Sequence, residues 1–109
     1  MGYMRHDAIV VTAFDKKNLE PARVKAEELE LPVSEIVESG TNGYVSFLIA
    51  PDGSKEGWEE SERGDHARDV WKAWACEARS RHVWLDWVHV SYAGDDGDDT
   101  KVVDHHYAR

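Results

Sequence analysis

The acidic and imidazole side chains near the end of the chain are the residues best suited to metal chemistry. Asp104, His105 and His106 stand together, and carboxylate and imidazole groups are the usual ligands of hydrolytic metal sites. Adjacent residues of a strand point to opposite faces, however, so His105 and His106 are poorly placed to hold one ion. The sequence also lacks an H-x-x-x-H pair and a second cysteine. We therefore expect no metal and no cofactor, and metal-assisted hydrolysis ranks third among the functions considered.

Nucleophilic catalysis finds little support in the sequence. Cys76 is the only cysteine, and Glu77 beside it tends to raise the thiol pKa, which opposes formation of a thiolate. Neither a G-x-S-x-G motif nor a phosphate-binding glycine loop occurs, so we expect no catalytic residues. A single cysteine also favours a reducing compartment, and the first residues show no export signal, so a cytoplasmic location is expected. No apolar run approaches the roughly 18 residues of a membrane helix.

One tryptophan lies in a segment that is otherwise polar and rich in glycine, APDGSKEGWEESERGD (50–65). We predict a loop there, with Ser54–Arg63 as the rim of a functional surface. Trp58 either anchors the loop to the body of the protein or contacts a partner, and we favour the anchor narrowly, with the acidic flanks as the contact surface. In a nucleotide-binding alternative, Trp58 stacks on a base while Arg63 or Arg68 lies near phosphate. The candidate ligand-binding or partner-binding residues are Trp58, Glu59, Glu60, Glu62, Arg63 and Arg68.

The charge balance bears on the kind of partner. The 109 residues carry 22 acidic and 13 basic side chains, a formal net charge of −9 at pH 7. Direct nucleic-acid binding is disfavoured, because it needs a basic face that releases counterions from phosphates. A basic partner protein or a cationic ligand suits this chain better.

The apolar patterns that must position these residues indicate a single α+β domain. We predict strands at 6–14, 33–39, 44–50 and 83–93, and helices at 19–30 and 65–80. Asn18 and Asp65 are the expected N-caps, and Pro21 is expected in the first helical turn. This β-α-β-β-α-β order is typical of a ferredoxin-like sandwich, an antiparallel sheet with two helices on one face, and 100–107 are expected to add a C-terminal strand. The expected core comprises Ile9, Val11, Leu29, Val45, Phe47, Ile49, Val70, Trp74, Val88 and Val90.

The strand at 83–93 is apolar on both faces. If Val88 and Val90 point at the helices, Leu85, Trp87 and His89 lie on the uncovered face of the sheet. An uncovered apolar face predicts a second layer, most simply a second copy in a homodimer formed through Leu85, Trp87 and His89. The alternative is that the C-terminal strand or residues 1–4 cover that face within the same chain.

Three stretches, NGYVSFLIAPDGSKEGWEES, MGYMRHDAIVVTAF and SYAGDDGDDTKVV, together resemble a group of small proteins of unknown function from tailed bacteriophages and prophages. The resemblance spans nearly the whole chain and brings no catalytic residues with it. It implies a viral origin and an accessory role inside a bacterial cell. The leading hypothesis is therefore a non-enzymatic phage accessory protein that binds a host or viral protein, ahead of a nucleotide-binding or sequestering protein and the hydrolase.

Overall fold

The computed structural model describes residues 5–54, 57–94 and 100–106. An α+β fold is present, as predicted, with strands, helices and one 3₁₀ helix alternating along the chain. In order, they are β1 (His6–Ala13), α1 (Lys16–Glu28), β2 (Val37–Glu38), β3 (Val45–Ile49), α2 (Glu59–Cys76), the 3₁₀ helix η1 (Ala78–Arg81), β4 (Asp86–Tyr92) and β5 (Lys101–His106).

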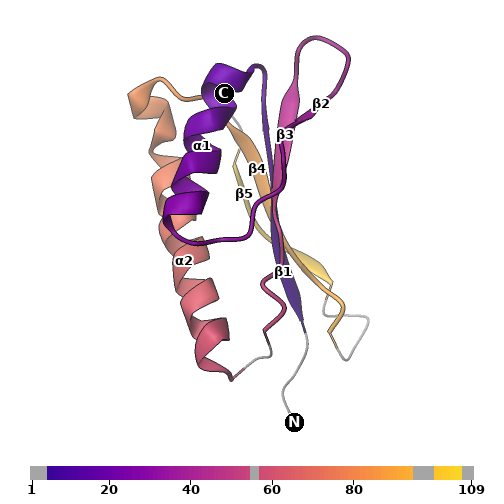
Figure 1. Cartoon of the computed structure of the whole chain (residues 1–109), viewed down its shortest axis with the longest axis vertical. Coiled ribbons are helices and arrows are strands. Elements are labelled where there is room, and N and C mark those ends of the chain that lie inside the picture. Colours follow the sequence, from indigo (N-terminus) through magenta and orange to yellow (C-terminus); the bar gives the residue numbers. More distant parts are fainter. Residues whose placement is uncertain (1–4, 55–56, 95–99, 107–109) are drawn as a thin grey trace.

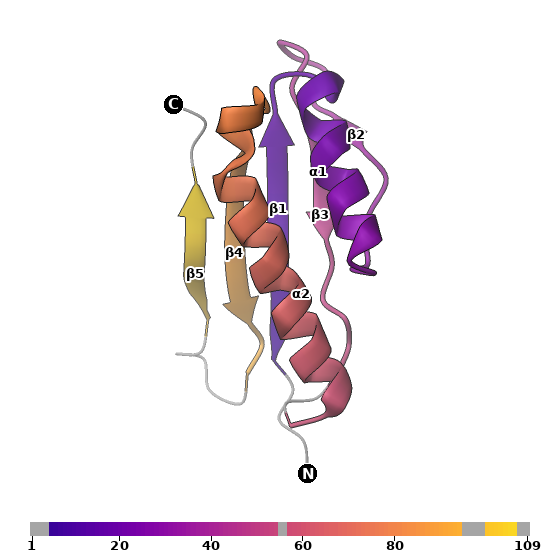
Figure 2. The ribbon, with the colours of Figure 1, turned by 90° about the vertical axis from the view of Figure 1, so that its left-hand side faces the viewer.

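The strands form one sheet in the order β2-β3-β1-β4-β5, and every neighbouring pair is antiparallel. Both helices pack on the same face of this sheet, as Figures 1 and 2 show. The C-terminal strand is present as β5, and it extends the sheet beside β4 instead of covering a face. The resulting five-strand order therefore differs from the four-stranded ferredoxin-like order that the sequence pattern predicted.

Helix α1 begins three residues before the predicted start. Asp15 is the N-cap, and its side chain accepts a hydrogen bond from the backbone N–H of Asn18 at 2.9 Å. The prediction that Asn18 caps the helix is wrong. Asn18 is buried inside the first turns, where its Oδ1 accepts from the backbone N–H of Trp84 at 2.8 Å. Pro21 consequently lies inside the helix and not in its first turn.

Helix α2 begins six residues before the predicted start, so the second half of the expected loop is helical. Trp58 occupies the N-cap position, and three acidic residues, Glu59, Glu60 and Glu62, fill the first turn. Carboxylates at that end interact favourably with the helix dipole, which explains why an apparently loop-like sequence is helical. Asp65 is not the N-cap; its carboxylate instead forms an ion pair with Arg68 one turn further along α2.

The core lies between the helices and the sheet. Predicted core members Ile9, Val11, Val45, Phe47 and Ile49 are all buried. Leu29 and Trp74 are partly buried and pack against this cluster. Val70 is also partly buried but is not part of the cluster. The centre of the core is Trp71, which is fully buried and donates its indole N–H to the carbonyl of Ala22 at 3.0 Å, joining the two helices.

The predicted orientation of β4 is wrong. Leu85, Trp87 and His89 are buried under the helices, and Val88 and Val90 face the opposite side of the sheet. The larger side chains fill the space below α2: the Trp87 ring meets Trp71 edge-on, with centroids 5.8 Å apart. Alternate side chains of a strand point to opposite faces, so a register that is wrong by one residue places every side chain of β4 on the wrong face of the sheet.

The buried position of Trp71 makes a test of the core. Trp71→Ala is expected to lower the free energy of unfolding by about 3–5 kcal/mol, because it removes a packed ring and an inter-helix hydrogen bond. The matched control is Trp58→Ala, since that ring is 48% exposed; a cost of about 1 kcal/mol or less is expected. Urea denaturation measures both. Equal losses would show that Trp58 anchors its segment as firmly as Trp71 holds the core.

Candidate functional site

One face of the sheet carries no helix in the described part of the chain (Figure 1). We call it the open face. The alternation of burial and the strand registers assign its side chains to His6, Ala8, Val10, Thr12, Val37, Ser46, Leu48, Asp86, Val88, Val90, Tyr92, Val102 and His105. It therefore holds a row of valines where the prediction placed Leu85, Trp87 and His89.

The open face is poor in charge. Among its strand residues named above, Asp86 is the single Asp, Glu, Lys or Arg, although these types make up 32% of the chain. Val10, Val37 and Val102 are 41%, 63% and 58% exposed. A hollow of about 350 Å³ lies over β1, β4 and β5, lined by Val10, Val88, Val102 and His105 among others. Apolar, weakly charged surface of this kind is characteristic of the centre of protein interfaces.

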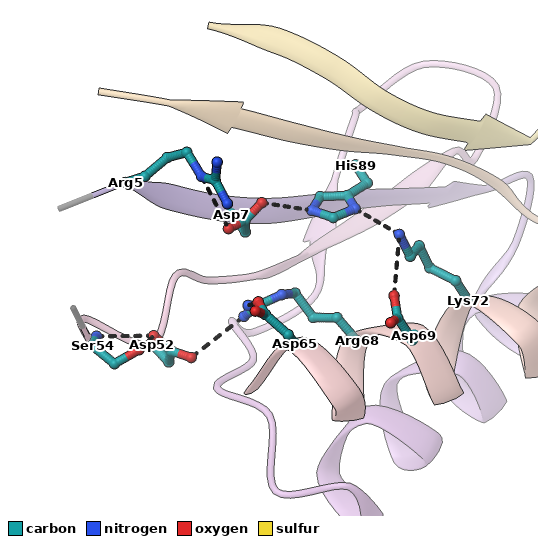
Figure 3. Close-up of polar contacts among 9 residues, drawn as sticks. All are labelled: Arg5, Asp7, Asp52, Ser54, Asp65, Arg68, Asp69, Lys72 and His89. Atoms are coloured by element: carbon teal, nitrogen blue, oxygen red, sulfur yellow. Dashed lines mark hydrogen bonds and ion pairs between the residues drawn. The ribbon is translucent and has the colours of Figure 1, made fainter. Parts of the chain in front are cut away.

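The opposite, helix-covered face contains a buried polar cluster that the sequence analysis missed. His89 lies between Asp7 of β1 and Lys72 of α2 (Figure 3). Its Nε2 is 3.0 Å from Asp7 Oδ1, and its Nδ1 is 2.9 Å from Lys72 Nζ. A neutral ring that donates from Nε2 and accepts at Nδ1 satisfies both contacts. The signal was present in β1, where Asp7 shares the core-facing register of Ile9 and Val11 and so requires a polar partner.

Arg68 is the second centre of this cluster. Its side chain is buried and forms ion pairs with Asp65 and with Asp52, the latter at 3.4 Å. Asp52 also accepts hydrogen bonds from the backbone N–H and hydroxyl of Ser54. Because two carboxylates already surround Arg68, it is not the exposed phosphate ligand that the nucleotide-binding alternative requires.

The electrostatics of the two aspartates follow from these contacts. Burial raises the pKa of Asp7, but the hydrogen bond from His89 and the nearby charges of Arg68 and Arg5 outweigh it, so the pKa is lowered below its ordinary value. Burial likewise raises the pKa of Asp52, and the hydrogen bonds from Ser54 together with Arg68 lower it overall. Both side chains are therefore structural anions at neutral pH.

The candidate residues around Trp58 do not gather into a pocket with Arg68. Trp58, Glu59, Glu60 and Glu62 are exposed at the start of α2, and the exposed Arg63 pairs with Glu60 at 3.6 Å. The structure thus keeps the acidic residues and the indole on the surface. Of the predicted rim, residues 55 and 56 lie outside the described residues.

The groups considered for metal and thiol chemistry are separated. His106 stacks on Trp87 with centroids 6.3 Å apart, whereas His105 pairs in register with Val88 of the open face. In the described residues, no group of three or more His, Cys, Asp or Glu side chains is placed to hold a metal ion. Burial raises the pKa of the Cys76 thiol, and Asp104 and Glu77 add to the effect.

Comparison with known proteins yields no relative: no family model, curated protein or solved structure matches the chain. In the portion of the chain that the structure describes, neither α1 nor α2 has the length and apolarity needed to cross a membrane.

The lowered pKa of Asp7 predicts a pH dependence. A carboxyl whose pKa is lower in the folded state than the unfolded value of 3.8 stabilises the fold above that value, and this stabilisation is lost as the pH falls through the folded pKa. Asp7→Asn should therefore melt below the parent protein at neutral pH, and the gap should narrow below about pH 4. Melting temperatures measured from neutral pH to below pH 4 test this prediction. The control is Asp69→Asn, which removes the exposed carboxylate that pairs with Lys72. A gap between parent and Asp7→Asn that is constant with pH would contradict the assignment.

Proposed function

We propose that the protein is a non-enzymatic protein-binding module and that its open face binds a second copy of the chain. The observation that carries this proposal is the scarcity of charge on the open face of a strongly acidic protein. Two chains of net charge −9 repel one another, and a nearly uncharged contact surface keeps like charges from being brought together at the interface. A basic partner, by contrast, would find only Asp86 there among the strand residues described.

The geometry of a sheet supports this occupant. Two sheets pack face to face at about 10 Å, with interdigitating side chains of moderate size. Val10, Val88 and Val102 offer such side chains around a shallow hollow, and two copies related by a two-fold axis present the same surface to each other. The homodimer expected from the sequence is therefore kept as a proposal, with the valines in place of Leu85, Trp87 and His89.

The cellular role follows the resemblance to phage proteins. We propose an accessory protein acting in the cytoplasm of a bacterial host on a host or viral protein. In support of this, the exposed Glu59, Glu60 and Glu62 lie in the first turn of α2, with Trp58 as its N-cap. Helix α2 is on the far side of the sheet from the open face, so a dimer would leave these residues accessible to a basic partner. The nucleotide-binding and hydrolase alternatives find no comparable support, given the carboxylates around Arg68 and the separation of His105 from His106.

We also infer an elaborated ferredoxin-like sandwich. The support is the split β-α-β connection, in which β3 lies between β1 and β2 while α1 and α2 cover one face. In this view β5 is an addition at the edge beside β4.

Dimerisation is tested by sedimentation equilibrium at high micromolar concentration. The parent protein should have about twice the chain mass of 12.4 kDa. The double variant Val10→Asp/Val102→Asp should sediment as a monomer, because it places four carboxylates in the interface of two chains. Both positions are exposed, so the monomer should fold, which circular dichroism checks.

The control for the dimer is Val24→Asp, a valine of α1 that is 51% exposed and lies away from the open face. It should leave the parent mass unchanged. A parent protein with the mass of one chain would overturn the proposed dimer. A double variant that stays dimeric would show that the interface is on another surface, which would overturn the assignment to the open face.

A further inference from the structure

A second cavity, of about 290 Å³, lies between the middle of α2 and the strands β1, β4 and β5. Its walls include Arg5, Asp7, Arg68, Lys72, Ser91 and Lys101. It is bounded by the buried polar cluster of Figure 3 and lies on the helix side of the sheet. The open face and its valines have no part in it, so it is independent of the proposed dimer.

One of the lining residues of this cavity has a buried hydroxyl without a hydrogen bond in the described residues. Ser91 is only 1% exposed, and its Oγ has no hydrogen-bond partner in the described residues. A buried polar group left in this state costs about 1–3 kcal/mol. Ser91 pairs in register with Asp7 on one side and Lys101 on the other, so the three residues form a row across β1, β4 and β5. A ligand held above this row would satisfy the hydroxyl.

The charges around the cavity decide what that ligand is. The carboxylates on its wall are all engaged: Asp7 with His89, Asp65 with Arg68, and Asp69 with Lys72 at 3.7 Å. Lys101, by contrast, forms no ion pair with any described residue. Among the described side chains of the wall, the Lys101 ammonium and the Ser91 hydroxyl are thus two groups available to a ligand, and both are hydrogen-bond donors.

We propose that this cavity binds a small oxyanion, a phosphate or carboxylate group, between the Lys101 ammonium and the Ser91 hydroxyl. Charge-assisted hydrogen bonds from a lysine to such groups are about twice as strong as neutral ones. Arg68 and Lys72 are held by their carboxylates and set the positive border of the site. The same position suits a free anion or an anionic group of a larger metabolite, since the cavity is open on one side.

The test is a titration of the ¹⁵N-labelled protein with sodium phosphate and, separately, sodium acetate, each against sodium chloride at equal ionic strength. Saturable shifts of the Ser91 and Lys101 amide signals are expected with at least one of the two anions. Saturation by phosphate alone assigns a tetrahedral ligand, and saturation by acetate alone assigns a carboxylate. Shifts that match those in chloride with both anions would overturn the proposal.

Two variants separate this site from general charge attraction. Ser91→Ala should weaken binding about two- to tenfold, as expected for a lost hydrogen bond, and Lys101→Gln should weaken it at least as much. The matched control is Lys17→Gln, an exposed lysine of α1 remote from the cavity. Equal weakening by Lys17→Gln, or unchanged binding in Ser91→Ala and Lys101→Gln, would overturn the site. The melting temperature of each variant without anion shows that it is folded.

Discussion

The orientation of β4 is the constraint on which the rest of the structure depends. Three contacts made on the helix side set it: the N–H of Trp84 donates to Asn18 of α1, Trp87 packs edge-on against Trp71 of α2, and His89 reaches Asp7. The Trp87 and His89 contacts would be lost if β4 slipped by one residue, because every side chain of the strand would then change face, and the Trp84 hydrogen bond fixes the segment that leads into the strand. The Trp71 hydrogen bond to Ala22 couples the two helices, so these contacts hold the whole helical layer against the sheet.

Both proposed surfaces follow from that orientation. With Leu85 and Trp87 turned inward, the residues left outside on β4 are Asp86, Val88, Val90 and Tyr92, which gives the open face its low charge. The same choice brings His89 and Ser91 under α2, where apolar packing gives way to polar groups. One end of the helix–sheet interface is thus filled by Trp71 and Trp87, whereas the other end keeps a polar cavity.

The sequence was sufficient for the number and type of elements, because periodicity and turn residues act locally. It predicted both α-helices and five strands, but the predicted strand at 33–39 is only the two-residue β2 (Val37–Glu38), and the end of the second helix is the separate 3₁₀ helix η1. It could not settle β4, because Leu85 and Trp87 on one register and Val88 and Val90 on the other are both apolar. The orientation of β4 is set by contacts with residues distant in the chain, above all those of Trp87 with Trp71 and of His89 with Asp7. The start of α2 differs from the predicted start for a related reason: glycine and acidic residues predict a loop, although carboxylates in a first turn favour a helix.

Arg68 shows how a residue can be recognised as important and still be given the wrong role. Its guanidinium turns back along α2 to Asp65 and across to Asp52, so it ties the turn at Pro51–Ser54 to the helix. Gly64 makes the approach of Asp52 possible, because a Cβ at that position would clash with the Asp52 carboxylate. A glycine inside a helix costs about 1 kcal/mol relative to alanine; here it admits a charge-assisted contact that a larger residue would block. The ion pair with Arg68 engages Asp65, which lines the cavity, and so leaves the hydroxyl of Ser91 and the ammonium of Lys101 to define the chemistry of the proposed site.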